Sequence, residues 1–135
     1  MKREENYLRL SASDLANHLG CRHLTVLDQA VAEGQLKAPG WRDPALAVLE
    51  ERGFAHEKNY LDYLRSALGL TVVEIGGEGA VGAVFERVRD AMQSGIQVIY
   101  QAPFVRERWY GRVDVLRRVD RPSELGNWSY EVIDT

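Results

Sequence analysis

The side chains that could do chemistry in this chain are an imidazole and two carboxylates in its second half. The imidazole is His56, and the carboxylates that fall in predicted strands are Asp114 and Asp134. Carboxylate oxygens are the ligands that Mg²⁺ prefers, and Mn²⁺ accepts an added imidazole. An ion held in this way activates water and stabilises charge on a phosphoryl group. The three residues therefore predict a divalent-metal site, provided that the fold brings them together.

Each candidate residue also has a purely structural interpretation. Asp114 fits a solvated strand face shared with arginines. Asp134 fits either a solvated rim or a carboxylate with a cationic partner, because an unpaired buried charge is very costly. A lone histidine such as His56 is more often a hydrogen-bonded core residue than a ligand. The neighbouring Glu57 is most simply a solvated helix residue, and Gln101 a loop contact at the end of a strand.

Helices and strands in a recognisable order must position these residues. Ser11 or Ser13 caps the first helix, and Asp43 followed by Pro44 begins a long helix that stops at Gly69. The predicted helices cover about 13–20, 22–33, 44–69 and 77–95, and the predicted strands cover about 70–76, 96–102, 108–120 and 128–135. This order predicts an α/β or α+β fold, with helices flanking a central mixed sheet of about four strands.

Periodicity predicts which way the candidate residues project. On the long helix, His56 falls on an apolar stripe that should face the sheet. In the strand 108–120, alternation separates Asp114 from Val113 and Val115, which share the other face. In the last strand, Asp134 extends an apolar face. The stripe of His56 contains Leu49, Gly53, Tyr60 and Leu64, and the face of Asp134 contains Trp128, Tyr130 and Val132.

Length and composition narrow the class of protein. The 135 residues fit one domain, which we divide into a helical N-terminal segment, 1–43, and a core, 44–135. No run approaches the roughly 18 apolar residues that span a membrane, and the first ten residues lack the apolar region of a secretory signal. The single cysteine, Cys21, excludes an internal disulfide, so we predict a cytoplasmic protein.

Charge is unevenly distributed along the chain. The net charge of −3 does not indicate a nucleic-acid-binding protein, but residues 103–122 hold six arginines against three acidic residues. Arginine suits bidentate contacts with phosphate, although a GC-rich genome would produce the same preference for arginine. The segment is therefore a candidate phosphate-binding surface that needs support from other residues.

Several short motifs resemble those of a known family. The stretches "GFAHE", "VIYQA", "WYGRVDVL" and "YEVIDT", in that order, resemble the RecB-like branch of the PD-(D/E)xK nuclease superfamily. More closely, they resemble a bacterial set of RecB-family nucleases that are often fused to a superfamily 1 helicase. The N-terminal stretch "LSASDLANHLGCRHLTVLD" is also similar to that set. The resemblance covers nearly the whole chain.

The resemblance implies a restriction-endonuclease-like core, incomplete at its C-terminus, that cleaves DNA with Mg²⁺ or Mn²⁺. Asp114 matches the end of a G-x-x-D pattern, and Asp134 matches the first residue of D-x-K. In the RecB-like branch the helix histidine, here His56, is a metal ligand. Glu57 would act beside the ion or on a second ion, and Gln101 matches a glutamine near the site only loosely.

The resemblance also implies DNA contacts and a possible cluster. The residues expected to contact DNA are Arg108, Arg112, Arg118, Tyr110 and Gln101. Several RecB-like nucleases carry an iron–sulfur cluster held by one cysteine near the N-terminus and three near the C-terminus. Cys21 matches the first of these, so a cluster is expected only in a longer chain. The alternative is a small apolar cysteine that is buried.

The motif lysine would follow Thr135, so we expect a fragment that cleaves DNA poorly or not at all. Losing one such electrostatic contact costs on the order of a hundredfold in rate. One alternative is a non-catalytic nucleic-acid-binding module with a degenerate nuclease fold. Another is a structural domain whose carboxylates pair with Arg112 and Arg118. The expected partners are DNA and a fused or associated helicase, with no membrane.

Overall fold

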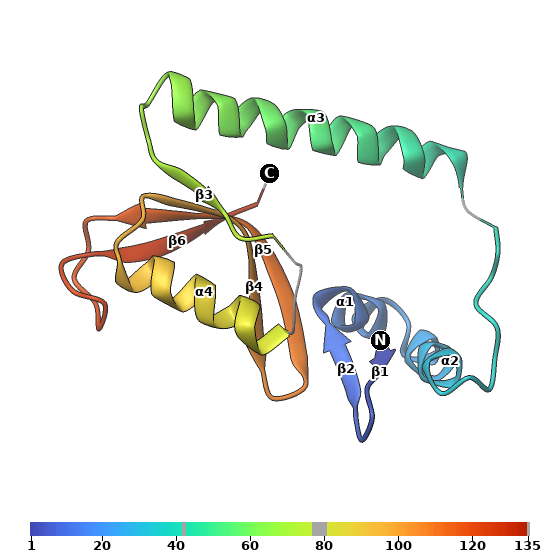
Figure 1. The fold of residues 1–135 in the computed structure, drawn as a ribbon. Helices are drawn as coiled ribbons and strands as arrows, with labels where there is room; N and C mark the ends of the chain where they lie inside the picture. The colour runs from blue at the N-terminus through green and yellow to red at the C-terminus, as the bar shows by residue number, and fades with distance from the viewer. Residues whose placement is uncertain (42, 77–80, 135) are drawn as a thin grey trace. The chain divides into compact units, whose positions relative to one another are not determined.

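The computed structural model describes residues 1–41, 43–76 and 81–134. The described residues form a mixed α/β fold with helices and strands interleaved along the chain (Figure 1). The elements are β1 Lys2–Arg3, β2 Leu8–Ser11, α1 Ala12–Gly20, α2 Arg22–Ala32, α3 Pro44–Ser66, β3 Val72–Glu74, α4 Val81–Gln93, β4 Val98–Arg106, β5 Trp109–Val119 and β6 Ser129–Ile133. The predicted α/β class is therefore confirmed.

The sheet has six strands, so the prediction of about four was wrong. Its order is β1-β2-β5-β4-β3, and β6 pairs with β5. The two missed strands, β1 and β2, form a short antiparallel hairpin, and β2 pairs in parallel with β5 through Leu10 and Trp109. They were missed because charged residues dominate this segment, and its strands of two and four residues are too short to show alternation.

The predicted elements are otherwise largely present. The helices α1, α2 and α3 occupy the predicted ranges, and Asp43 caps α3 by accepting a hydrogen bond from the backbone N–H of Ala45 at 2.9 Å. Strand β4 continues to Arg106, beyond the predicted end at 102. The predicted start of the fourth helix, at 77–80, and the predicted end of the last strand, Thr135, lie outside the described residues.

Contacts divide the chain into two compact units. The first, which we call the N-terminal unit, comprises 1–41 together with 105–111, at the tip of the β4–β5 hairpin. The second, the core unit, comprises 42–104 and 112–135. Each is described by itself below. No helix in the described part of the chain combines the length and apolar character needed to cross a membrane.

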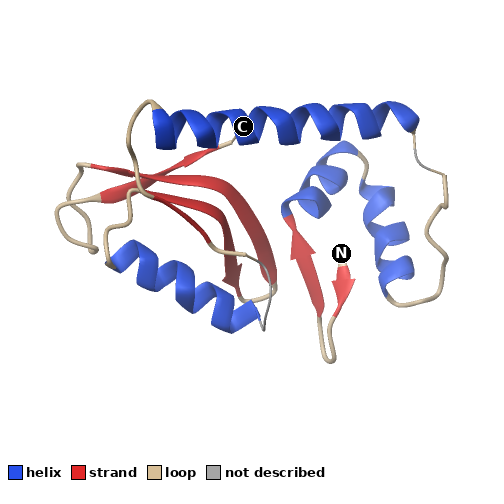
Figure 2. Ribbon diagram, turned by 45° about the horizontal axis from the view of Figure 1, so that its top comes forward, coloured by secondary structure: helices blue, strands red, loops and turns tan. Residues whose placement is uncertain are grey.

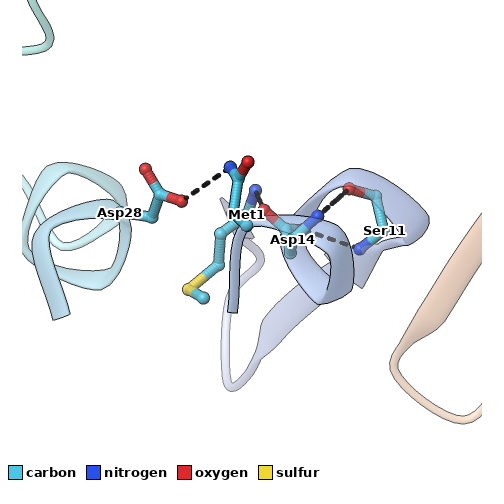
Figure 3. A network of polar contacts seen from close by, with 5 residues as sticks. Met1, Ser11, Asp14 and Asp28 are labelled. Carbon is cyan, nitrogen blue, oxygen red and sulfur yellow. Dashed lines mark hydrogen bonds and ion pairs between the residues drawn. The ribbon is translucent and has the colours of Figure 1, made fainter. Parts of the chain in front are cut away.

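In the N-terminal unit, Asp14 fixes the start of α1. Ser11, rather than Ser13, is the N-cap residue, and its backbone N–H and hydroxyl both donate to Asp14 Oδ2, at 2.7 and 2.8 Å (Figure 3). The Met1 ammonium contacts the other oxygen of the same carboxylate. Asp14 is buried, while Asp28 on α2 accepts a more exposed bond from Asn17. The buried carboxylate thus joins the chain start, the cap and the helix.

This network predicts that the N-terminal unit loses stability in acid. Burial by itself would raise the pKa of Asp14, but the bonds from the Met1 ammonium and Ser11 outweigh burial and lower the pKa below its ordinary 3.8. The stabilisation is therefore present above that value and lost as the pH falls through the lowered pKa. Asp14→Asn should cost about 1 kcal/mol at neutral pH, as cap removals do, and should flatten the acid slope measured by urea unfolding. Asp28→Asn is the matched control and should leave the slope in place.

The core unit buries its apolar side chains on both faces of the sheet, between α3 and α4 (Figure 2). One set packs with α4, and we call it the α4-side cluster: Ile75, Val84, Val88, Ile99, Ala102 and Leu116. The other packs with α3, and we call it the α3-side cluster: Leu61, Leu64, Val98 and Val115. The core unit is thus a three-layer arrangement in which the strands carry side chains to both helices.

Candidate active site

The register of β5 and β6 brings two predicted site residues together. Val115 is paired with Ile133 at the end of this antiparallel ladder. The next residue on each strand is Asp114 on β5 and Asp134 just after β6, so continuing the ladder by one pair would oppose the two carboxylates. Opposed residues of an antiparallel pair have Cβ atoms about 4.5–5.5 Å apart where the ladder continues, and like charges there repel. This end of the ladder is therefore a place that attracts a cation.

The register of β4 and β5 adds a third residue to the same row. A two-residue turn at 107–108 connects the two strands, and at the other end the N–H of Arg118 donates to the carbonyl of Gln97 at 2.8 Å. Both ends agree on one register, in which Gln101 lies opposite Asp114. Gln101, Asp114 and Asp134 therefore follow one another across three neighbouring strands, β4, β5 and β6.

Both β4 and β5 are irregular at this row. Ile99 and Ala102 belong to the same cluster although they are three positions apart, and regular alternation would place them on opposite faces. Gln101, between them, has a φ of +56°, which is uncommon for any residue but glycine. A residue in this conformation interrupts regular alternation and so redirects the side chains next to it in the strand.

The same irregularity corrects the predicted faces of β5. Val113 packs against the α4-side cluster, whereas Val115 belongs to the α3-side cluster. The prediction that they share a face was wrong, because it assumed regular alternation through Asp114. Gln101 also lies inside β4 rather than at its end, so it is not a loop contact.

On α3 the roles of His56 and Glu57 are the reverse of those predicted. Glu57 is buried, with 8% of its surface exposed, and it accepts a hydrogen bond from Gln101 Nε2 at 2.6 Å. His56 is exposed. The buried residues of the helix are Glu57, Leu61 and Leu64. The face that meets the sheet is therefore rotated by about one residue from the predicted stripe that contained His56. Apolar residues occur on several sides of α3, so periodicity alone was ambiguous, and the bond to Gln101 compensates a carboxylate that sequence would leave in water.

Tyr100 completes a small polar network around Glu57. Burial raises the pKa of Tyr100 above its ordinary 10.0, and the hydrogen bond and negative charge of Glu57 raise it further, while Gln101 lowers it. The phenol therefore donates to the carboxylate. Tyr100 also packs against the α3-side cluster, so this network joins β4 firmly to α3.

This network predicts a measurable change in phenol ionisation. Glu57→Gln should lower the pKa of Tyr100, because the charge is lost, but burial should keep it above the ordinary value. Since the folded pKa is raised, the stabilisation is present below pH 10 and is lost as the pH rises through the raised pKa. Ultraviolet tyrosinate titration, with Tyr100→Phe subtracted in each background, measures the shift. The pKa of Tyr130, which is raised by that residue's own burial, is the internal control. A Tyr100 pKa that does not change in Glu57→Gln would contradict the network.

The oxygen atoms of Gln101, Asp114 and Asp134 are of the kind that binds a hard cation, although they are too few to fill its coordination shell without water. Asp114 and Asp134 supply carboxylates, and Gln101 Oε1 is buried with no hydrogen-bond partner among the residues described. Such oxygen donors suit Mg²⁺ or Mn²⁺ with several retained waters. Within 1–41, 43–76 and 81–134, no three His, Cys, Asp or Glu side chains are gathered as a metal site. The structure thus places the two aspartates at one end of the β5–β6 ladder and gathers neither them nor His56 into a group of three such side chains among the described residues.

The arginines predicted to contact DNA differ in their surroundings. Arg118 is half-buried, donates Nη1 to the carbonyl of Gly95 at 2.7 Å and lies 6.0 Å from the ring centre of Trp128. It therefore holds the loop after α4 against β5. Arg108 and Arg112 are exposed.

The remaining candidates lie in the N-terminal unit. Tyr110 is half-buried, with the Arg9 guanidinium 5.9 Å from its ring centre. Cys21 is exposed at the junction of α1 and α2, so the alternative of a buried apolar cysteine was wrong. Cys21 is both the C-cap residue of α1 and the N-cap residue of α2, and its exposed side chain makes no capping hydrogen bond.

Sequence reasoning did not foresee that Gln101, Glu57 and Tyr100 act together. The only signal was their polarity within otherwise apolar segments. Comparison of the chain with protein-family models, curated proteins and solved structures found no match.

Proposed function

We propose that this chain carries the metal-binding part of a nuclease, which hydrolyses phosphodiester bonds of DNA with Mg²⁺ or Mn²⁺. The observation that supports the proposal most is the pairing of Val115 with Ile133, which leaves Asp114 and Asp134 as the next residues at the same end of the β5–β6 ladder. Two carboxylates at opposed positions repel each other, and a divalent cation between them turns that repulsion into binding.

Each residue of the row has a distinct role in this proposal. Asp114 and Asp134 hold the ion, which when bound supplies a nucleophilic water and stabilises charge on the phosphoryl group. Asp114 is central, because β4 and β6 both flank its strand. Glu57 fixes the Gln101 amide from the α3 side. His56, exposed on the same helix, stays a prediction as a third ligand.

The proposed substrate follows from exposed arginines near the carboxylates. Arg112 lies on β5 close to Asp114 in sequence, and its side chain is exposed. Arginine contacts phosphate through paired N–H donors and confers salt-dependent binding. Arg118 is committed to the carbonyl of Gly95, so we assign it to structure rather than to DNA. A helicase partner and a cluster at Cys21 stay predictions.

The proposal is tested by incubating the chain with supercoiled plasmid and with single-stranded DNA in Mn²⁺. We expect slow cleavage that stops in EDTA, and measurable binding of Mn²⁺ without DNA. DNA binding without any Mn²⁺ uptake would favour the non-catalytic nucleic-acid-binding module. Cleavage that continues in EDTA would overturn the proposal, because the carboxylates would then have no part in it.

A further inference from the structure

Gln101 combines three unfavourable features in one residue of β4. Its backbone is left-handed, with a φ of +56°. Its amide Nε2 is committed to the buried carboxylate of Glu57, at 2.6 Å. Its Oε1 is buried and has no hydrogen-bond partner among the described residues. Strained backbone and orphaned buried acceptors are rare, and they occur together where function requires them.

The orientation of the amide follows from its partner. A carboxylate accepts and never donates, so the group facing Glu57 must be the NH₂ of Gln101. This leaves Oε1 pointing away from Glu57. No protein group among the described residues donates to Oε1, so we assign its partner to a water or a cation.

We propose that Gln101 is a positioning residue of the metal site, and that its Oε1 accepts a hydrogen bond from a water bound to the ion. This inference rests on the proposed function. Hard divalent ions retain waters in protein sites, and those waters are strong donors. Glu57 holds the amide through Nε2, and the register of β4 and β5 places Gln101 opposite Asp114. Removing such an outer partner typically weakens metal affinity by about 10–100-fold.

Glycine at position 101 separates a structural role of the residue from a role in metal binding. Gly tolerates a positive φ, so Gln101→Gly should relieve backbone strain while it removes the side chain. We expect relief of the backbone strain to offset part of the cost of leaving Glu57 without this donor, so that the variant folds, and we expect it to bind Mn²⁺ about tenfold more weakly. Mn²⁺ affinity is measured by electron paramagnetic resonance of the unbound ion. Water-proton relaxation per bound Mn²⁺ should also change, which a purely structural role would not cause.

Two further variants complete the experiment. Gln101→Glu combined with Glu57→Gln keeps an oxygen at the position of Oε1 and a hydrogen bond between positions 101 and 57, so it should keep at least the wild-type Mn²⁺ affinity. Gln97→Ala is the matched control: Gln97 Oε1 accepts from the Thr71 N–H at 2.8 Å, so its loss should lower stability and leave Mn²⁺ binding unchanged.

The outcomes distinguish this inference from the proposed function. No Mn²⁺ uptake by the unmodified chain would remove the proposed function and this inference with it. Uptake that is equal in the unmodified chain and in Gln101→Gly would overturn the inference alone. A loss of affinity in Gln101→Glu combined with Glu57→Gln as large as in Gln101→Gly would also overturn it, because an oxygen at this position would then not matter.

Discussion

Asp114→Asn is expected to weaken Mn²⁺ binding at least tenfold and to reduce metal-dependent cleavage about a hundredfold or more. The variant keeps the shape of the side chain and removes its charge. Asp114 lies on β5, which β4 and β6 flank, one position beyond the last pair of the β5–β6 ladder, so it is central to the proposed site. Electrostatic contributors of this kind are worth about 10²–10³ in rate. Mn²⁺ titration and plasmid nicking measure the two effects.

The same variant should behave differently when the metal is removed. In EDTA neither chain carries the ion, so a difference in the free energy of unfolding then measures the structural contacts of Asp114 rather than metal binding. Asp62→Asn on α3 is the control, because Asp62 is exposed and pairs only loosely with Arg65, at 4.0 Å. If Asp114→Asn and Asp62→Asn bind Mn²⁺ equally well, Asp114 is not a metal ligand.

Leu61→Ala is expected to cost about 2–5 kcal/mol of stability, whereas Leu49→Ala should cost less than about 0.5 kcal/mol. Both changes remove the same atoms from the same helix, α3. Leu61 is 6% exposed and belongs to the α3-side cluster, while Leu49 is 62% exposed. The pair tests which side of α3 meets the sheet, and so which of His56 and Glu57 faces inward.

Urea unfolding followed by circular dichroism measures both free energies. Leu64→Ala serves as the positive control, because Leu64 is fully buried and lies on both the predicted stripe and the observed face. A larger cost for Leu49→Ala than for Leu61→Ala would restore the original stripe and place His56 on the inner face. Loss of α3 docking should also reduce Mn²⁺ affinity in Leu61→Ala, because Glu57 is carried by this helix.

Sequence predicted well the elements that carry strong local signals. The cap at Asp43 with Pro44, a serine cap at the start of α1, for which Ser11 was one of two candidates, and the long strand β5 are all present. These signals act over a few residues, through hydrogen bonds and backbone preferences that do not depend on the rest of the chain. The hairpin of β1 and β2 was missed because a strand of two residues is defined only by its partner.

By itself, the sequence of this protein determined the α/β class, most of the elements, and Asp114 and Asp134 as the carboxylates to examine. Only the tertiary structure decided the register that leaves these two residues at the same end of the β5–β6 ladder and the left-handed backbone at Gln101. It also decided that Glu57, rather than His56, turns inward, because hydrogen bonds from Gln101 and Tyr100 compensate the buried carboxylate. Partners from other elements set these features, and no local pattern contains them.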